Sequence, residues 1–161
     1  LVITEIMVNP AAVADNKGEW FEIYNAGPSV NLKGWTIRDQ HTDLHVIPVD
    51  VLVPAGDHAV VGRSSVSLEN GGITVAYDAG GTFQLANGGD EVILADPEGQ
   101  VMDQVYFDTA GSPPWPVPDG ASISLSDPAL DNADPDNWCV ETDAWSGSAG
   151  DLGTPGAPTG C

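Results

Sequence analysis

Hydrophobic and polar residues alternate with a period of two along most of the chain, which is typical of β-strands whose two faces differ. Residues 1–8 (LVITEIMV) alternate in this way. Residues 19–25 (EWFEIYN) do so too, and there Phe21 and Ile23 face away from Glu22. In the first run the alternation predicts two opposite faces, with Val2, Thr4, Ile6 and Val8 on one and Ile3, Glu5 and Met7 on the other.

Further short strands are predicted between turn residues, and no window keeps a helical apolar stripe for three turns. Residues 90–96 and 100–107 flank a Pro-Glu-Gly turn and predict a β-hairpin. We therefore expect an all-β fold, a sandwich or a barrel, with very little helix. The remaining predicted strands lie near residues 35–38, 45–56, 58–62, 72–77, 82–86 and 121–126.

The character of the sequence changes near residue 126, where the alternation ends. A chain of 161 residues is long enough for one hydrophobic core, so we expect a single domain. Residues 1–125 are predicted to form the β-sandwich. Residues 126–161 are too rich in Pro and Gly for a strand and are predicted to be an irregular strap packed on the same domain. Its Trp138 and Trp145 would anchor it, because leaving them in water is unfavourable.

The net charge of the chain limits the classes of partner that it can bind. The chain carries 24 Asp and Glu against four Lys and Arg, a net charge of −20. Such a surface repels phosphate backbones, so direct nucleic-acid binding is not expected. The acidity favours solubility or, where carboxylates converge in space, the binding of divalent cations.

Five segments, taken in order, resemble the successive blocks of a lamin tail domain, and a closing TPGAP resembles the end of bacterial extracellular members. The resemblance implies an immunoglobulin-like antiparallel β-sandwich without enzymatic activity. In this fold Phe21, Ile23 and Trp35 would be core residues, packed against Leu85, Val92 and Leu94 from the opposite sheet. The five segments are ITEIMVNP, GEWFEIYNAG, NLKGWTIRD, VLVPAGDHAVVG and LANGGDEVILADPEGQVMDQVYF.

The function implied by the resemblance is a binding or structural module of an exported or cell-surface protein, with a protein or a surface polymer as partner. Two alternatives are an accessory domain that positions an adjacent nuclease or other hydrolase on its substrate, and a calcium-stabilised adhesion module. The chain has no run of about 18 apolar residues, so no membrane span is expected. We expect a monomer.

No arrangement of catalytic residues is evident, and none is predicted. His41 and His45 flank Asp43, but in an extended chain they lie about 13 Å apart, too far for shared zinc ligation unless the loop folds back. A polar loop is the simpler interpretation. Glu19 and Glu22 project to opposite sides of their strand, so they cannot share a proton or a metal. Glu19 is expected to be solvated or bonded to a turn.

Two further groups are candidates for binding. Asp131, Asp134 and Asp136 could contribute to a calcium site, although their spacing does not fit an EF-hand loop and turns capped by Asp side chains are the alternative. Trp115 and Trp145 lie in loop-like segments, where they would either bind a sugar or peptide or pack beneath the strap. No cofactor is predicted, with calcium as the alternative.

The two cysteines, Cys139 and Cys161, both lie in the strap. A disulfide between them is predicted, with two free thiols as the alternative. A disulfide implies an oxidising compartment, and therefore an extracellular or cell-surface location.

Overall fold

The strands form two main sheets and a small ribbon in the computed structural model, which describes residues 1–160. Helical structure is limited to α1 (Asp15–Gly18) and two 3-10 turns, η1 (Gly80–Thr82) and η2 (Pro135–Asn137). The strands are β1 (Val2–Met7), β2 (Trp20–Tyr24), β3 (Val30–Asn31), β4 (Thr36–Arg38), β5 (Leu44–Val46), β6 (Leu52–Val53), β7 (His58–Gly62), β8 (Tyr77–Asp78), β9 (Gly89–Ala95), β10 (Val101–Asp108), β11 (Ile123–Leu125) and β12 (Trp138–Val140).

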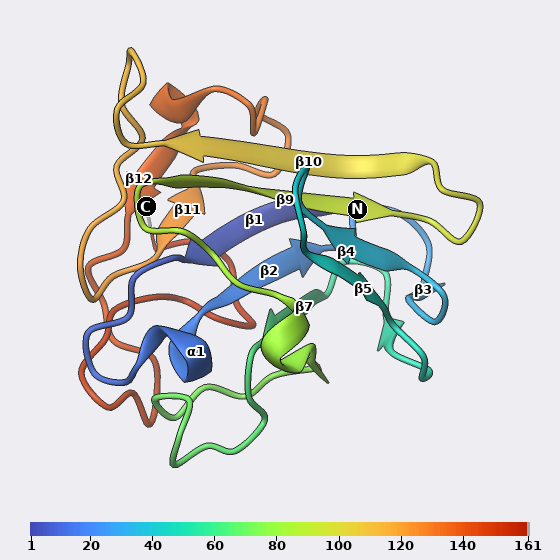
Figure 1. Cartoon of the computed structure of the whole chain (residues 1–161), viewed down its shortest axis with the longest axis horizontal. Coiled ribbons are helices and arrows are strands. Elements are labelled where there is room, and N and C mark those ends of the chain that lie inside the picture. Colours follow the sequence, from blue (N-terminus) through green and yellow to red (C-terminus); the bar gives the residue numbers. More distant parts are fainter. Residues whose placement is uncertain (161) are drawn as a thin grey trace.

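The sheets pack as the two layers of a sandwich (Figure 1). One sheet has six strands in the order β12-β11-β1-β2-β7-β8, and the other has four in the order β10-β9-β4-β5. Strands β3 and β6 form a separate ribbon. All neighbours are antiparallel except β7 and β8. The fold is the predicted immunoglobulin-like sandwich, and the predicted hairpin is present as β9 and β10.

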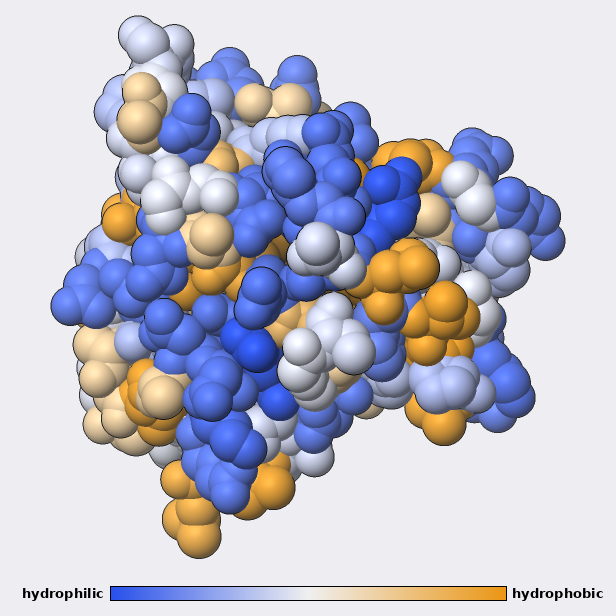
Figure 2. Space-filling view, in the orientation of Figure 1, coloured by the Kyte–Doolittle hydropathy of each residue, from blue (hydrophilic) through white to orange (hydrophobic). Residues whose placement is uncertain are grey.

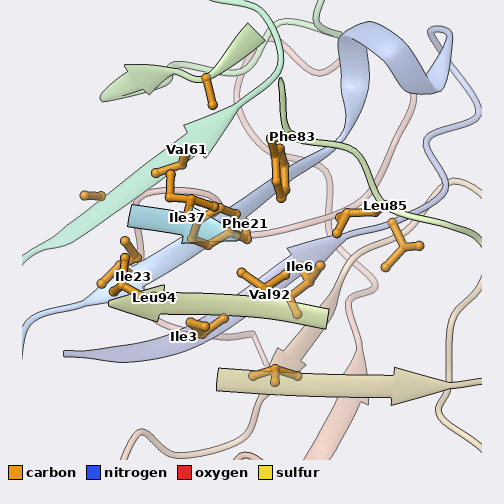
Figure 3. Packing of buried hydrophobic residues seen from close by; sticks show 14 of the residues in the cluster. Ile3, Ile6, Phe21, Ile23, Ile37, Val61, Phe83, Leu85, Val92 and Leu94 are labelled. Carbon is orange, nitrogen blue, oxygen red and sulfur yellow. The ribbon is translucent and has the colours of Figure 1, made fainter. Parts of the chain in front are cut away.

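The core lies between the two sheets (Figure 3). Phe21 and Ile23 on β2 are fully buried there, and the Phe21 ring lies 5.2 Å from that of Phe83. Val92 and Leu94 reach the core from β9 in the opposite sheet. Each fully buried side chain of this kind contributes roughly 1.5–3 kcal/mol. The core positions expected for these residues, and for Trp35 and Leu85, are confirmed. Trp35, however, directly precedes β4, which pairs with β9, so it lies on the same sheet as Val92 and Leu94 and not on the opposite one.

A bulge in β1 overturns the strict alternation predicted for residues 1–8. The register against β2 shifts between Ile3 and Glu5. A bulge adds one residue to one strand and so exchanges the faces beyond it. As a result Ile3 and Ile6 both enter the core, while Thr4 bonds the carboxylate of Glu22 on the opposite face.

Of the predicted strands, the one at residues 72–77 is much shorter than expected and the one at residues 82–86 is absent. Of residues 72–77, only Tyr77 joins a sheet, as the first residue of β8. In residues 82–86, Phe83 and Leu85 are buried as expected, yet the segment is not a strand. The backbone N–H of Leu85 donates to the Glu19 carboxylate at 2.9 Å. A buried side chain therefore replaces the neighbouring strand as hydrogen-bond partner.

Residues 126–160 of the C-terminal strap are irregular, as predicted, except that β12 extends the six-stranded sheet by pairing with β11. Trp138 on β12 is 6% exposed, and its indole N–H donates to the carbonyl of Asn132. Beyond β12 the strap returns across the sheet, where Leu152 bridges to Ala121.

Gly72 provides a test of how closely the strap approaches the sandwich. It has a φ of +87°, and an added Cβ would lie 2.0 Å from the carbonyl oxygen of Gly147 in the strap. Gly56 has a similar φ of +79° but no atom within 4 Å of an added Cβ. Gly56→Ala should therefore lower the free energy of unfolding by about 1–2 kcal/mol, the cost of the left-handed backbone alone.

Gly72→Ala carries the same backbone cost and also a clash with main chain. We expect a loss at least about 2 kcal/mol larger than that of Gly56→Ala, measured by urea unfolding. Equal losses in the two variants would show that the strap does not approach Gly72.

Candidate functional site

Three glutamates are buried on the outer face of the six-stranded sheet, beneath the strap. Glu5, Glu22 and Glu141 are 1%, 1% and 2% exposed, and we call them the carboxylate clasp. Glu5 on β1 and Glu22 on β2 are directly paired in register, so these two glutamates are neighbours across adjacent strands.

The carboxylate clasp binds the end of the strap through hydrogen bonds. Buried carboxylates are costly without donors, and here each is supplied with backbone N–H or hydroxyl groups. The strap contacts are Thr154 N and Oγ1 with Glu5 at 2.8 and 3.0 Å, Gly156 N with Glu22 at 2.6 Å, and Thr159 Oγ1 and Gly160 N with Glu141 at 2.9 and 3.0 Å.

Burial raises the pKa of Glu5 to about 7, against opposing hydrogen bonds from Ser122 and Thr154. The contacts of Thr154 agree with a protonated Glu5. Its Oγ1 lies 3.0 Å from Glu5 Oε2 and 3.2 Å from Glu141 Oε1, yet a hydroxyl has one proton to donate. Both contacts are satisfied when Glu5 carries a proton and donates it to Thr154.

A pocket of about 240 Å³ opens beside the clasp, between the sheet and the strap residue Pro158. Glu22 lines it and bonds His58 Nδ1 at 2.7 Å, an interaction that raises the pKa of His58. Ser124 also lines the pocket, but its buried hydroxyl has no hydrogen-bond partner among the described residues. Because no histidine contacts this hydroxyl, serine, histidine and glutamate do not form a nucleophilic relay here.

Glu19 is neither solvated nor bonded to a turn, contrary to expectation. It is 2% exposed, and burial raises its pKa to about 7. Its Oε2 accepts hydrogen bonds from Arg63 Nη1 and from the N–H of Leu85, both at 2.9 Å. Glu19 therefore fixes the segment before β9 to the start of β2. Among the described residues, Glu19 and Glu22 share no hydrogen-bond partner, as the sequence predicted for side chains on opposite faces.

A second and larger pocket, of about 700 Å³, lies at one end of the four-stranded sheet. We call it the acid–histidine pocket, after Asp39, His41 and Glu91 on its wall. Asp39 directly follows β4 and Glu91 lies on β9. His41 Nδ1 is 3.8 Å from Glu91 Oε2 and 4.0 Å from Asp39 Oδ2. Tyr106 on β10 borders the same pocket.

The structure separates the two histidines that the sequence placed together. His45 on β5 bonds the hydroxyls of Thr82 and Tyr77, each at 2.6 Å. His41 instead approaches Asp39 and Glu91. Glu91 is 50 residues away in sequence, and only the pairing of β4 with β9 brings it near. That pairing was not predicted, so no local sequence pattern indicated that Asp39, His41 and Glu91 would lie together.

The proposed calcium ligands belong to local turns. Asp131 Oδ1 accepts the N–H of Ala133, and Asp134 Oδ1 accepts the N–H of Asp136. Within residues 1–160, Asp131, Asp134 and Asp136 are not among the side chains whose ligand atoms converge. These observations favour the alternative of turns capped by Asp side chains.

Both candidate tryptophans pack against other aromatic rings. Trp115 is 7% exposed, and its ring centroid lies 5.4 Å from that of Trp138. Trp145 is partly buried and meets Trp20 edge-on at 6.3 Å. The packing favours the structural alternative for both. The predicted disulfide includes Cys161, which lies outside the described residues.

The fold and these sites define an immunoglobulin-like domain in which the strap covers one sheet, while a pocket lies at the end of the other. The Lamin Tail Domain family model matches residues 1–109. The chain therefore belongs to the lamin tail domain family, whose members are non-enzymatic immunoglobulin-like domains. A search of curated proteins finds no match. Within the described residues, no helix has the length and apolar character required to cross a membrane.

The raised pKa of Glu5 predicts a pH-dependent stability. A carboxyl group with an ordinary value of 4.5 and a folded value of about 7 binds protons more tightly in the folded state. Its stabilising contribution is complete below 4.5 and is lost as the pH rises through 7. Glu19 and His58 act in the same direction. The free energy of unfolding should thus be higher near pH 5 than near pH 8, with a share from Glu5 of up to about 3 kcal/mol.

Glu5→Gln should flatten this pH dependence, because the amide is neutral throughout. Glu98→Gln removes an exposed carboxylate from the β9–β10 turn and should leave the pH dependence unchanged. Urea unfolding across the pH range measures both variants. An unaltered slope in Glu5→Gln would contradict the protonation of the clasp.

Proposed function

We propose that this domain is a non-catalytic binding module of an exported or cell-surface protein, and that it binds a protein partner through the outer face of its four-stranded sheet. The observation that carries the proposal is the exposure of apolar side chains on that face. Leu44 and Val46 on β5 are 63% and 52% exposed. They alternate with His45, which turns toward Tyr77 in the other sheet.

Further exposed apolar residues lie near β5. Leu44 pairs in register with Arg38 on β4, and Val46 pairs with Thr36. Val49 and Leu52 beyond β5 are also at least half exposed. Figure 2 shows hydrophobic surface gathered on the side where β5 and the β3–β6 ribbon lie, next to strongly hydrophilic surface. Contiguous apolar surface with a polar border is typical of interaction sites.

The edge of the sheet adds backbone groups to this surface. Strand β5 is the last strand of its sheet and pairs only with β4 among the described residues. Its outer edge can therefore accept an added strand from a partner. The acid–histidine pocket borders the same sheet, and the chain carries a net charge of −20. These features favour a partner segment with apolar side chains next to Lys or Arg.

The absence of catalysis is supported by the family and by the chemistry of the buried carboxylates. Glu5 and Glu22 are close enough to interact, but the oxygens of both accept hydrogen bonds from the strap and the sheet. Glu22 lines a pocket, whereas Glu5 is not among the residues lining it. Glu5 and Glu22 therefore do not face a bound substrate together as an acid and a base.

Peptide selection tests the binding face without a known partner. A random peptide library displayed on phage would be selected on the wild-type domain, and the affinities of the selected peptides measured in solution. We expect peptides that combine apolar residues with Lys or Arg. Their affinity should fall at least about tenfold in Leu44→Ser, because the anchoring contact is lost.

Leu68→Ser is the matched control, since Leu68 is 97% exposed in a loop away from the four-stranded sheet. It should leave the affinities unchanged. Equal binding by the wild type and Leu44→Ser, or the selection of acidic peptides, would exclude this face as the binding surface.

Export is supported by the two cysteines of the strap, for which a Cys139–Cys161 disulfide remains a prediction. Protein secreted into an oxidising compartment should not react with iodoacetamide after denaturation without reductant, and should gain two labels after reduction. Intact mass spectrometry distinguishes these states. Two labels without prior reduction would remove the support that the cysteines give to export.

A further inference from the structure

We propose that Asp39, His41 and Glu91 form a binding site for a divalent transition-metal ion, with Zn²⁺ as the best match. The site lies in the acid–histidine pocket and is independent of the apolar surface on β5. Within residues 1–160 these three side chains are the only His, Cys, Asp or Glu group of three or more whose ligand atoms all lie within 4.8 Å of one another.

The spacing of the ligand atoms is close to that of a tetrahedral metal site. Zinc bonds of about 2.0–2.1 Å place neighbouring ligand atoms roughly 3.4 Å apart. The Nδ1 atom of His41 lies 3.8 Å from Glu91 Oε2 and 4.0 Å from Asp39 Oδ2. The His41 side chain is 75% exposed, so it has room to rotate inward by the few tenths of an ångström required.

The two carboxylates are held in place before any metal arrives. Their side chains are only 10% and 14% exposed for Asp39 and Glu91. Asp39 Oδ1 accepts the N–H groups of His41 and Asp43 at 2.8 and 2.9 Å, which leaves Oδ2 directed toward His41. Glu91 Oε2 accepts the N–H of Gln40 in the same turn. Such outer contacts orient ligands and strengthen metal binding.

Among the described residues, no Lys or Arg side chain forms an ion pair with the carboxylates that line the pocket. Asp90 and Asp108 also line the pocket, together with Asp39 and Glu91. Arg38 is near, but its guanidinium donates to the carbonyl oxygen of Asp39, not to a carboxylate. The other basic residues form ion pairs elsewhere among the described residues: Lys17 with Glu69, Lys33 with Asp50 and Arg63 with Glu19.

The imidazole determines which metals fit. Ca²⁺ and Mg²⁺ prefer sites made entirely of oxygen, whereas one imidazole with two carboxylates suits Zn²⁺ and the neighbouring transition metals. His41 therefore distinguishes this site from a cluster of surface carboxylates. The pocket of about 700 Å³ leaves space for water or an external ligand at the remaining coordination position.

Isothermal titration of the metal-free protein with ZnCl₂, without a histidine tag, tests the site. We expect one Zn²⁺ per chain, with an affinity that His41→Ala lowers at least about tenfold. His45→Ala is the matched control, because the imidazole of His45 bonds Thr82 and Tyr77 and does not face the pocket. It should leave zinc affinity unchanged.

Three further measurements make the result decisive. Co²⁺ should give visible ligand-field absorption bands that disappear in His41→Ala, and circular dichroism melting should show that this variant remains folded. Ca²⁺ should bind more weakly than Zn²⁺. The proposal is overturned if zinc does not bind, if folded His41→Ala binds it as tightly as the wild type, or if Ca²⁺ and Zn²⁺ bind equally.

Discussion

The hydrogen bonds between the carboxylate clasp and the strap hold the end of the strap on the six-stranded sheet. Glu5 and Glu22 lie in the middle of the six-stranded sheet, where a carboxylate excluded from water requires donors. The strap provides them from backbone N–H groups and threonine hydroxyls. Apolar contacts add to these bonds, because Trp145 of the strap packs against a second, smaller hydrophobic cluster that contains Met7, Trp20, Val60 and Ile73.

The clasp also connects the region that matches the family model to the segment that follows it. The family match spans residues 1–109 and therefore contains Glu5 and Glu22. Thr4 and His58, which bond Glu22, lie within the match. Ser122, Thr154 and Gly156, which also bond these two glutamates, lie beyond it. The matched region alone would therefore lack some of the donors that these buried carboxylates have in the structure.

The sequence predicted those features that depend on local pattern. Alternation placed Phe21 and Ile23 in the core, and turn chemistry located the hairpin of β9 and β10. The sequence did not predict features that depend on a strand or side chain far away along the chain. The bulge in β1 brings Ile3 into the core and moves Thr4 to the clasp, and no single-strand pattern indicates it. Likewise, β12 forms because the edge of β11 is available, in a segment that appeared too rich in Pro and Gly.

The candidate sites show the same contrast between features set by local sequence and features set by long-range pairing. The Asp side chains of residues 131–136 cap turns within a few residues, as their spacing favoured, whereas the group around His41 required the register of β4 against β9. The two sheets differ in what lies on them. The strap bonds Glu5 and Glu22 of the six-stranded sheet. The exposed apolar residues of β5 and the acid–histidine pocket both border the four-stranded sheet. The proposed binding face thus lies on the sheet that does not carry the carboxylate clasp.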